Sequence, residues 1–278
     1  MRDVEDLEDI VIDEYIERST YEYLIKKINN EGALHFSLID PDPLRQGPIK
    51  AAKMAKYAED AGTDVILIGG STICDQNFVD KTIQAIKSKV EVPIIIFPGG
   101  IGNISQYADA IFFMSLLNSS DPYSIVGQQA LASYTIKSFN LEYISMAYLI
   151  IEPGGSAGWI GNAKLLPRKK PKLTAAYALA AEMFGFKVIY LEAGSGSEKI
   201  PIEHIKTCSS ILNIPIIAGG GVDNKEDAKA FVEAGADIVT QGTFLENHIL
   251  KDNGNSLKEV IDEIKNIGKS QKKNFILK

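Results

Sequence analysis

The feature that most limits how this chain can fold is a regular alternation of short apolar runs with longer amphipathic segments. The eight apolar runs are ALHFSLID, DVILIGGS, PIIIFPGG, AIFFMSLLN, YISMAYLIIEPGG, VIYLEAGSG, PIIAGGGV and DIVTQGT. Each run is nearly continuous in apolar residues, which is typical of parallel strands that are covered on both faces. Helical patterns such as PIKAAKMAKYAEDAG and KEDAKAFVEAG separate most of the runs, and several of these patterns close on glycine, a common helix stop.

This alternation predicts an α/β protein with a single (β/α)₈ TIM barrel, and a doubly wound open sheet is the alternative. Only IGNISQYAD separates the third and fourth runs. That segment is too short for a crossover helix, so we expect the third helix to be missing or irregular. Residues 1–30 precede the first strand and are expected to form an N-terminal helical extension across the barrel bottom or at an interface. The barrel domain would then comprise residues 31–278.

Composition excludes several classes of function. The chain has 29 basic and 36 acidic residues and a net charge of −7, which disfavours nucleic acid as a partner. Its two cysteines are too few for a disulfide framework and are expected to be buried or inert. The acidic start MRDVEDLEDI does not resemble a secretory signal, and no apolar run reaches the ~18 residues of a membrane helix. We therefore expect a cytoplasmic protein.

The active site of a parallel barrel forms where the strands end, so the residues that close each apolar run are the informative ones. Acids and glycines concentrate there: Asp40, Asp42, Gly69–Thr72, Gly99, Gly100, Ser115, Asn118, Glu152, Glu192, Gly194–Gly196, Gly219–Gly221, Gly242 and Thr243. Loops after strands seven and eight often bind phosphate through bare backbone N–H groups beside a helix start. Gly220, Gly221, Gly242 and Thr243 occupy those loops, and Ser195 and Gly196 could add donors. Any one glycine alone is explained as well by a tight turn.

Asp40 ends the first strand, where a carboxylate could hold Mg²⁺ together with the hydroxyl of Ser71. The LIDPD stretch fits a helix cap equally well, with Asp40 or Asp42 closing the first turn. The basic turn at Arg168 could meet a second phosphate or could simply be solvated. The histidines have no sequence pairing with a nucleophile and are interpreted as structural.

Apolar residues at the ends of strands four and five are unusually many for a site that handles a phosphate. They are Met114, Leu116, Leu117, Tyr148, Ile150 and Trp159. Most are expected to be core, because inward residues of a barrel are bulky. Trp159 lies instead in a glycine-rich loop and could line a groove or a subunit contact.

Several of these motifs together resemble the geranylgeranylglyceryl phosphate synthases, specifically the larger archaeal-type group. The motifs are YLEAGSG, GGG at 219–221, GGST at 69–72, FPGG, FFMSLLN and YLIIEPGG, and the similarity extends from about His35 to about Gly242. The resemblance implies a TIM barrel without a regular third helix. It also implies an Mg²⁺-dependent transfer of geranylgeranyl from its diphosphate to the C3 hydroxyl of sn-glycerol 1-phosphate, which releases diphosphate.

The resemblance also implies roles for particular residues. Asp40 and Ser71 would hold Mg²⁺, and Glu192 would be the general base. The residues implied to bind glycerol 1-phosphate are Tyr190, Leu191, Glu192, Ala193, Gly194, Ser195, Gly196, Gly220, Gly221, Gly242 and Thr243. The apolar stripe of strands four and five would hold the prenyl chain. Relatives of this kind are commonly oligomeric, so a homo-oligomer is expected, and a lipid product suggests transient contact with a membrane surface.

Two other readings remain. A phosphate-sugar isomerase or aldolase on the same fold would share the phosphate loops, but it should show a strand-end lysine or a base and acid suited to carbonyl chemistry. A non-catalytic phosphate- or flavin-binding barrel would keep the glycines without needing Asp40 and Glu192.

Overall fold

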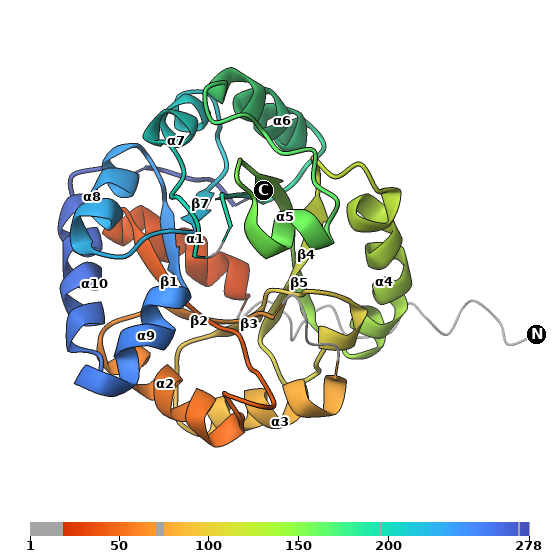
Figure 1. Cartoon of the computed structure of the whole chain (residues 1–278), viewed down its shortest axis with the longest axis vertical. Helices are drawn as coiled ribbons and strands as arrows, with labels where there is room; N and C mark the ends of the chain where they lie inside the picture. Colours follow the sequence, from red (N-terminus) through yellow and green to blue (C-terminus); the bar gives the residue numbers. More distant parts are fainter. Residues whose placement is uncertain (1–18, 71–74, 195, 272, 278) are drawn as a thin grey trace, which may run out of the picture.

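The computed structural model describes residues 19–70, 75–194, 196–271 and 273–277. Eight parallel strands form one closed barrel in chain order, with β1 beside both β2 and β8 (Figure 1). The strands are β1 (Leu34–Ile39), β2 (Val65–Ile68), β3 (Ile94–Ile96), β4 (Ala110–Leu116), β5 (Glu142–Ile150), β6 (Val188–Glu192), β7 (Ile216–Gly219) and β8 (Ile238–Gln241). Each lies in one of the eight apolar runs, except that β5 begins one residue before its run, at Glu142. The predicted TIM barrel is therefore confirmed.

Helices surround the barrel and alternate with its strands. They are α2 (Pro48–Asp60), α3 (Gln76–Lys87), α4 (Gln128–Ser138), α5 (Gly155–Ile160), α6 (Pro171–Met183), α7 (Ile202–Ser209), α8 (Lys225–Glu233), α9 (Thr243–Asp252) and α10 (Asn255–Gly268). Between β3 and β4 lies only the single turn η2 (Ile101–Asn103), and the π-helical turn η3 (Tyr123–Gly127) leads into α4. The expected irregularity of the third helix is confirmed.

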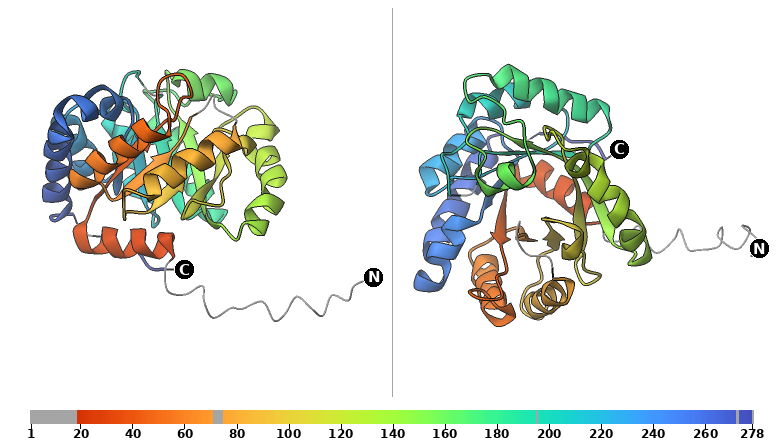
Figure 2. Two further views of the ribbon diagram at one scale, coloured as in Figure 1. Left: turned by 90° about the horizontal axis from the view of Figure 1, so that it is seen from below. Right: turned by 45° about the vertical axis from the view of Figure 1, so that its right-hand side comes forward.

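Helix α1 (Thr20–Glu31) lies across the bottom of the barrel, as Figure 2 shows. Its side chains Leu24, Ile25 and Ile28 pack in the same cluster as the barrel interior. The Glu142 carboxylate accepts hydrogen bonds from the Thr20 N–H at 2.6 Å and the Tyr21 N–H at 3.0 Å. These bonds satisfy two of the free N–H groups at the helix start, so the helix is tied to the first residue of β5.

Two apolar layers result from the alternation of side chains along each strand. Phe36, Leu67 and Phe112 point into the barrel, whereas Ile66, Ile111 and Leu191 pack between the barrel and the helices. The outer layer also holds Cys208, and burial raises the pKa of its thiol to about 12, as expected for an inert cysteine. Cys74 lies outside the described residues. Since both layers are filled, the strands' carboxyl ends form the accessible end of the barrel.

Candidate active site

Glu192 is the last residue of β6, and its side chain points toward the barrel axis. Along β6 the inward residues are Val188 and Tyr190, so the period of two places Glu192 on the same side. The carboxylate is 5% exposed, and the Tyr148 hydroxyl donates a hydrogen bond to its Oε2 at 2.5 Å. Burial, followed by the nearby Glu192 charge, raises the pKa of Tyr148 well above its usual value. Tyr148 therefore stays protonated and orients the Glu192 carboxylate.

Three aromatic rings support Glu192 from inside the barrel. Phe97 stacks on Tyr190 with ring centroids 5.0 Å apart, and Tyr148 meets both rings edge-on, at 5.5 Å and 5.4 Å. The Tyr190 hydroxyl lies against the backbone of Gly219, where an added Cβ would be 2.4 Å from the oxygen. The rings hold one another in fixed positions, so they form a rigid floor under the site.

A small polar pocket lies beside Glu192, over the ends of β6, β7 and β8. Its lining consists of Leu38, Tyr190, Glu192, Gly196, Gly220, Gly221, Val222, Asp223, Thr240, Gln241, Gly242, Thr243 and Phe244. Gly220 and Gly221 have φ values of 82° and 71°, in the left-handed region that favours glycine. Helix α9 begins at Thr243, so its free N–H groups and the positive end of its dipole face the same pocket. This geometry suits a phosphate group.

The structure gathers most of the predicted phosphate-site residues in this pocket. Leu191 and Ala193 are exceptions, because their side chains lie in the outer layer between barrel and helices. Only the backbone of these two residues is available on the site side. Gly194 has a φ of 101° and packs against the backbone of Gly154 and Gly155, which positions the loop rather than lining the pocket. Ser195 lies outside the described residues.

Asp40 follows β1 and faces the same space. Its Oδ1 is buried and has no hydrogen-bond partner among the described residues. The space in front of Asp40 Oδ1 is open because residue 69 is glycine: an added Cβ at Gly69 would be 2.4 Å from that oxygen. Burial, followed by the charges of Glu246 and Glu192, raises the pKa of Asp40 to about 7. A buried carboxylate without a partner, close to other acids, is the environment expected of a cation ligand.

Within the LIDPD stretch, the capping role that was the alternative to metal binding belongs to Asp42. Its Oδ1 accepts a hydrogen bond from the Leu44 N–H at 2.7 Å, and its carbonyl accepts one from the Gln46 N–H at 2.7 Å. Ser71 lies outside the described residues. Within the described part of the chain, no three His, Cys, Asp or Glu side chains converge on a common metal position. Mg²⁺ usually keeps waters and substrate phosphates as ligands, so Asp40 fits as one ligand of such an ion.

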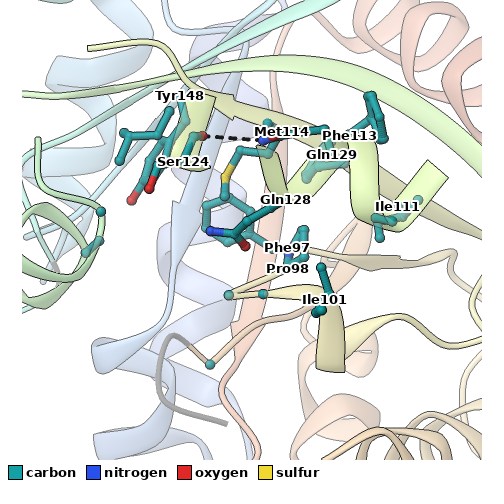
Figure 3. A pocket seen from close by; sticks show the side chains of 18 of the residues that line it. Phe97, Pro98, Ile101, Ile111, Phe113, Met114, Ser124, Gln128, Gln129 and Tyr148 are labelled. Carbon is teal, nitrogen blue, oxygen red and sulfur yellow. Dashed lines mark hydrogen bonds between the residues drawn. The ribbon is translucent and has the colours of Figure 1, made fainter. Parts of the chain in front are cut away.

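An apolar groove of about 270 Å³ leads away from Asp40 and Glu192, toward the gap in the helix layer. Figure 3 shows Phe97, Met114 and Gln128 converging on this space, with Ile111 and Phe113 farther along. Its other lining residues include Leu38, Ile101, Ile104, Leu116, Gln129, Ala132, Ile136, Tyr148, Ala157 and Ile160. Leu38 and Glu192 line both the groove and the polar pocket, so the two cavities meet at the carboxylate.

Sequence reasoning identified only part of this groove. Met114, Leu116 and Tyr148 line it, whereas Leu117 and Ile150 belong to the core and Trp159 is 85% exposed. The missed part comes from outward residues of β4 and from Ala132 and Ile136 of α4. The short segment IGNISQYAD between the third and fourth apolar runs could have indicated this part of the groove. A barrel that lacks the crossover helix at this point leaves outward residues of the adjacent strand uncovered.

Arg168 contacts backbone rather than the phosphate pocket. Its guanidinium donates hydrogen bonds to the carbonyls of Glu152, at 3.0 Å, and Lys199, at 2.9 Å, and it pairs with Glu198 at 3.3 Å. It therefore joins the loops after β5 and β6. The His204 Nε2–H donates a hydrogen bond to the Arg168 carbonyl at 2.8 Å, and His204 is fully buried, which supports the structural interpretation.

The sequence pattern of the PcrB family matches residues 26–266. The chain belongs to the PcrB family. It is 46% identical to a geranylgeranylglyceryl phosphate synthase from Thermococcus sibiricus, over 88% of this chain and 96% of that protein. It is 50% identical to the enzyme of that name from Methanosphaera stadtmanae, over 84% and 95% of the two chains.

The comparison with solved structures finds similar proteins of the same name. This PcrB-family chain is 41% identical to the Thermoplasma acidophilum (S)-3-O-geranylgeranylglyceryl phosphate synthase in complex with its substrate sn-glycerol-1-phosphate, with a TM-score of 0.85 over 90% and 99% of the two chains. An N-acetylmannosamine-6-phosphate 2-epimerase from Clostridium perfringens is 15% identical with a TM-score of 0.52, which shows a shared fold alone. None of the helices that the structure describes is long and apolar enough to cross a bilayer.

Proposed function

We propose that this protein transfers a geranylgeranyl group from its diphosphate to the C3 hydroxyl of sn-glycerol 1-phosphate, the first ether-forming step of an archaeal-type membrane lipid. The observation that carries the proposal is the meeting of two unlike cavities at Glu192. The glycine-lined pocket suits a phosphate, and the apolar groove suits a hydrocarbon chain. A reaction that joins a glycerol phosphate to a prenyl chain needs both cavities and a base between them.

In the proposed reaction, Glu192 orients the glycerol hydroxyl and accepts its proton. The hydroxyl oxygen forms a bond to C1 of the prenyl chain, while the bond between C1 and the diphosphate oxygen breaks and diphosphate leaves. Tyr148 keeps the Glu192 carboxylate in position throughout, and the groove excludes water from the developing allylic cation. The glycine loops and the start of α9 hold the glycerol phosphate still.

The cofactor we propose is Mg²⁺, held by Asp40 and, from outside the described residues, by Ser71. When bound, it would neutralise charge on the leaving diphosphate. We expect Asp40→Asn to weaken Mg²⁺ binding measured by calorimetry with diphosphate present, while the protein keeps its folded circular dichroism spectrum. Asp42→Asn is the matched control, because Asp42 caps a turn instead. Equal Mg²⁺ affinity in the wild type and Asp40→Asn would contradict the assignment.

The experiment that tests the function is an incubation with Mg²⁺, sn-glycerol 1-phosphate and prenyl diphosphates of several lengths, followed by extraction of the ether lipid. We expect most product from the C20 donor. If no ether lipid forms from any donor, the isomerase or binding-protein alternative is favoured. Among the described strands none ends in lysine, and the acids Asp40 and Glu192 already have roles in the transfer, so no observation favours a second candidate.

We further propose that the chain forms a homo-oligomer, acts in the cytoplasm and meets membranes only transiently. Trp159 and Tyr134 are 85% and 87% exposed, and large exposed aromatic side chains are enriched at protein interfaces. The net charge of −7 disfavours lasting attachment to anionic lipid. Light scattering of the wild type and of Trp159→Ser measures the oligomer, and a monomeric wild type would contradict it.

A further inference from the structure

Gln241, the last residue of β8, joins the outer layer of the barrel to the loop that follows β7. Its side chain is 2% exposed, and its Nε2 donates a hydrogen bond to the Val222 carbonyl at 2.8 Å. Val222 comes directly after Gly220 and Gly221, which line the proposed phosphate pocket. The Gln241 amide therefore holds the carboxyl end of the glycine loop.

This loop needs a tertiary anchor because its own sequence does not select one backbone conformation. Two consecutive glycines in the left-handed region lose much conformational freedom when they are ordered. On the other side, Gly221 packs against the backbone of Lys199, where an added Cβ would be 2.8 Å from the Lys199 nitrogen. The loop is thus confined between the Lys199 backbone and the Gln241 amide.

A buried histidine contacts the oxygen of the Gln241 amide. His35 is 0% exposed, and its Nε2 is 3.2 Å from Gln241 Oε1, while its Nδ1 is 2.9 Å from the Thr63 hydroxyl. Because the Val222 carbonyl can only accept, the amide nitrogen must face it and the amide oxygen must face His35. His35 Nε2 then carries the proton and Nδ1 accepts, and the Thr63 hydroxyl lies closer to Nδ1, at 2.9 Å, than to the carbonyls of His35 and Val65, at 3.1 Å and 3.3 Å. All three bonds point in one direction along the chain.

Burial keeps this arrangement in one protonation state. The pKa of His35 is lowered to about 3, mainly by burial; the Gln241 hydrogen bond opposes this lowering, and the nearby charge of Lys265 adds to it. Asp64 accepts the His35 backbone N–H at 2.8 Å, and its carboxylate is paired with Lys265 at 2.5 Å and with Lys27 at 2.9 Å. The imidazole therefore stays neutral across the pH range in which an enzyme of this kind is assayed.

We propose that Thr63, His35 and Gln241 form a positioning relay that fixes the Gly220–Gly221 loop for the phosphate of the glycerol substrate. None of the three is needed for the chemical step. The relay rests on the proposed function only for the identity of the ligand, because the loop it holds lines the polar pocket and not the apolar groove. Its loss should weaken glycerol phosphate binding and leave the prenyl side unchanged.

The decisive variant is Gln241→Met, which keeps the volume of the side chain but removes both hydrogen bonds. We expect KM for sn-glycerol 1-phosphate to rise roughly five- to tenfold, because the bond to Val222 that anchors the glycine loop is lost, with kcat and KM for the prenyl diphosphate within about a factor of two. His35→Asn, which cannot span the same distance, should give a smaller rise in the same constant. Both variants are also titrated by calorimetry with sn-glycerol 1-phosphate alone.

Ile86→Ala is the control for general loss of stability, because Ile86 is buried in α3 and contacts neither cavity. It should lower the melting temperature without changing KM for sn-glycerol 1-phosphate. Equal changes for both substrates in Gln241→Met, or unchanged glycerol phosphate affinity, would overturn the relay. If the wild type forms no ether lipid but binds sn-glycerol 1-phosphate with an affinity that Gln241→Met reduces, the proposed function fails while the relay stands.

The imidazole nitrogen chemical shifts of His35, measured by NMR, report its tautomer and protonation state independently of enzyme activity. We expect a neutral Nε2–H imidazole that does not titrate between pH 5 and 8, and Gln241→Met should allow the other tautomer to appear, because it removes the acceptor of the Nε2 proton. A His35 that titrates near its usual pKa in the wild type would refute the relay.

Discussion

At the scale of single residues, two close contacts make the site depend on particular side chains. Glu192 is held by Tyr148 at 2.5 Å, and the Tyr190 hydroxyl packs against Gly219. Both contacts involve residues at strand ends, where the backbone is rigid. A change of one atom at either place should therefore have a measurable effect on activity or stability.

Glu192→Gln should lower kcat by about a hundred- to ten-thousandfold, because glutamine cannot accept the proton of the glycerol hydroxyl. Calorimetry should still detect sn-glycerol 1-phosphate, since the glycine loops that bind the phosphate are unchanged. The measurement is product formation with a radiolabelled prenyl diphosphate. A variant that turns over at the wild-type rate would remove Glu192 from the mechanism.

Gly219→Ala should destabilise the fold by about 1–3 kcal/mol, because the new methyl group would lie 2.4 Å from the Tyr190 oxygen. Tyr190→Phe deletes that oxygen, so the double variant should be more stable than the sum of the two single changes predicts. Urea unfolding of the four proteins measures this coupling. Strictly additive free energies would show that the contact is not the cause.

At the scale of elements, the groove exists because no crossover helix lies between β3 and β4. With only η2 between β3 and β4, Ile111 and Phe113 of β4 face α4 across open space instead of a packed helix. Hydrogen bonds attach α4 and the preceding turn η3 to β4: Gln129 of α4 donates to the Met114 carbonyl, and Ser115 donates to the Ile125 carbonyl of η3 at 2.8 Å. The groove thus has fixed walls from β4 and α4, α5 contributes Ala157 and Ile160 to its lining, and no crossover helix between β3 and β4 fills it.

Ala132→Phe should narrow this groove, since Ala132 lies on the face of α4 that lines it. We expect kcat/KM for geranylgeranyl diphosphate to fall roughly ten- to a hundredfold, with a smaller loss for a C10 donor that does not reach so far. Ala130→Phe is the matched control on the exposed face of the same helix. Equal losses for the two donors would show that the prenyl chain does not pass Ala132.

At the scale of the whole molecule, stability and chemistry are located at opposite ends of the barrel. At the bottom, Asp237 accepts the Ile216 N–H at 2.9 Å and pairs with Lys273 at 3.0 Å, while Asn29 exchanges two hydrogen bonds with the backbone of Phe275. These contacts attach the C-terminal segment beneath the strands. None of them involves a residue that lines either cavity.

Asp237 should make the stability of the fold depend on pH. Burial raises its pKa to about 6 against the opposing effect of Lys273, so the folded state holds a proton that the unfolded chain has already lost. This contribution is fully present below the unfolded pKa and is lost as pH rises through about 6. From pH 7.5 to 4.5 the wild type should gain about 2 kcal/mol relative to Asp237→Asn in urea unfolding. An equal pH dependence of the two proteins would contradict this.

Most of the fold followed from the sequence. Eight near-continuous apolar runs separated by helical patterns are typical of the buried parallel strands of a closed barrel, so the barrel was predictable. The IGNISQYAD segment is too short to form a crossover helix, so the irregularity between the third and fourth strands was predictable too. Part of the site was predictable too, because the residue that closes a barrel strand always faces the same end. Asp40, Glu192 and the paired glycines are of this kind.

What the sequence could not decide depends on packing between distant segments. The outward residues of β4 became groove walls only because α4 stands off from them, and Gln241 acquired a role only through His35, 206 positions away along the chain. The distance between packed elements and the hydrogen-bond partners of distant residues are long-range properties, so the tertiary structure alone determined them. The order of strands and the residues at their ends were already determined by the sequence.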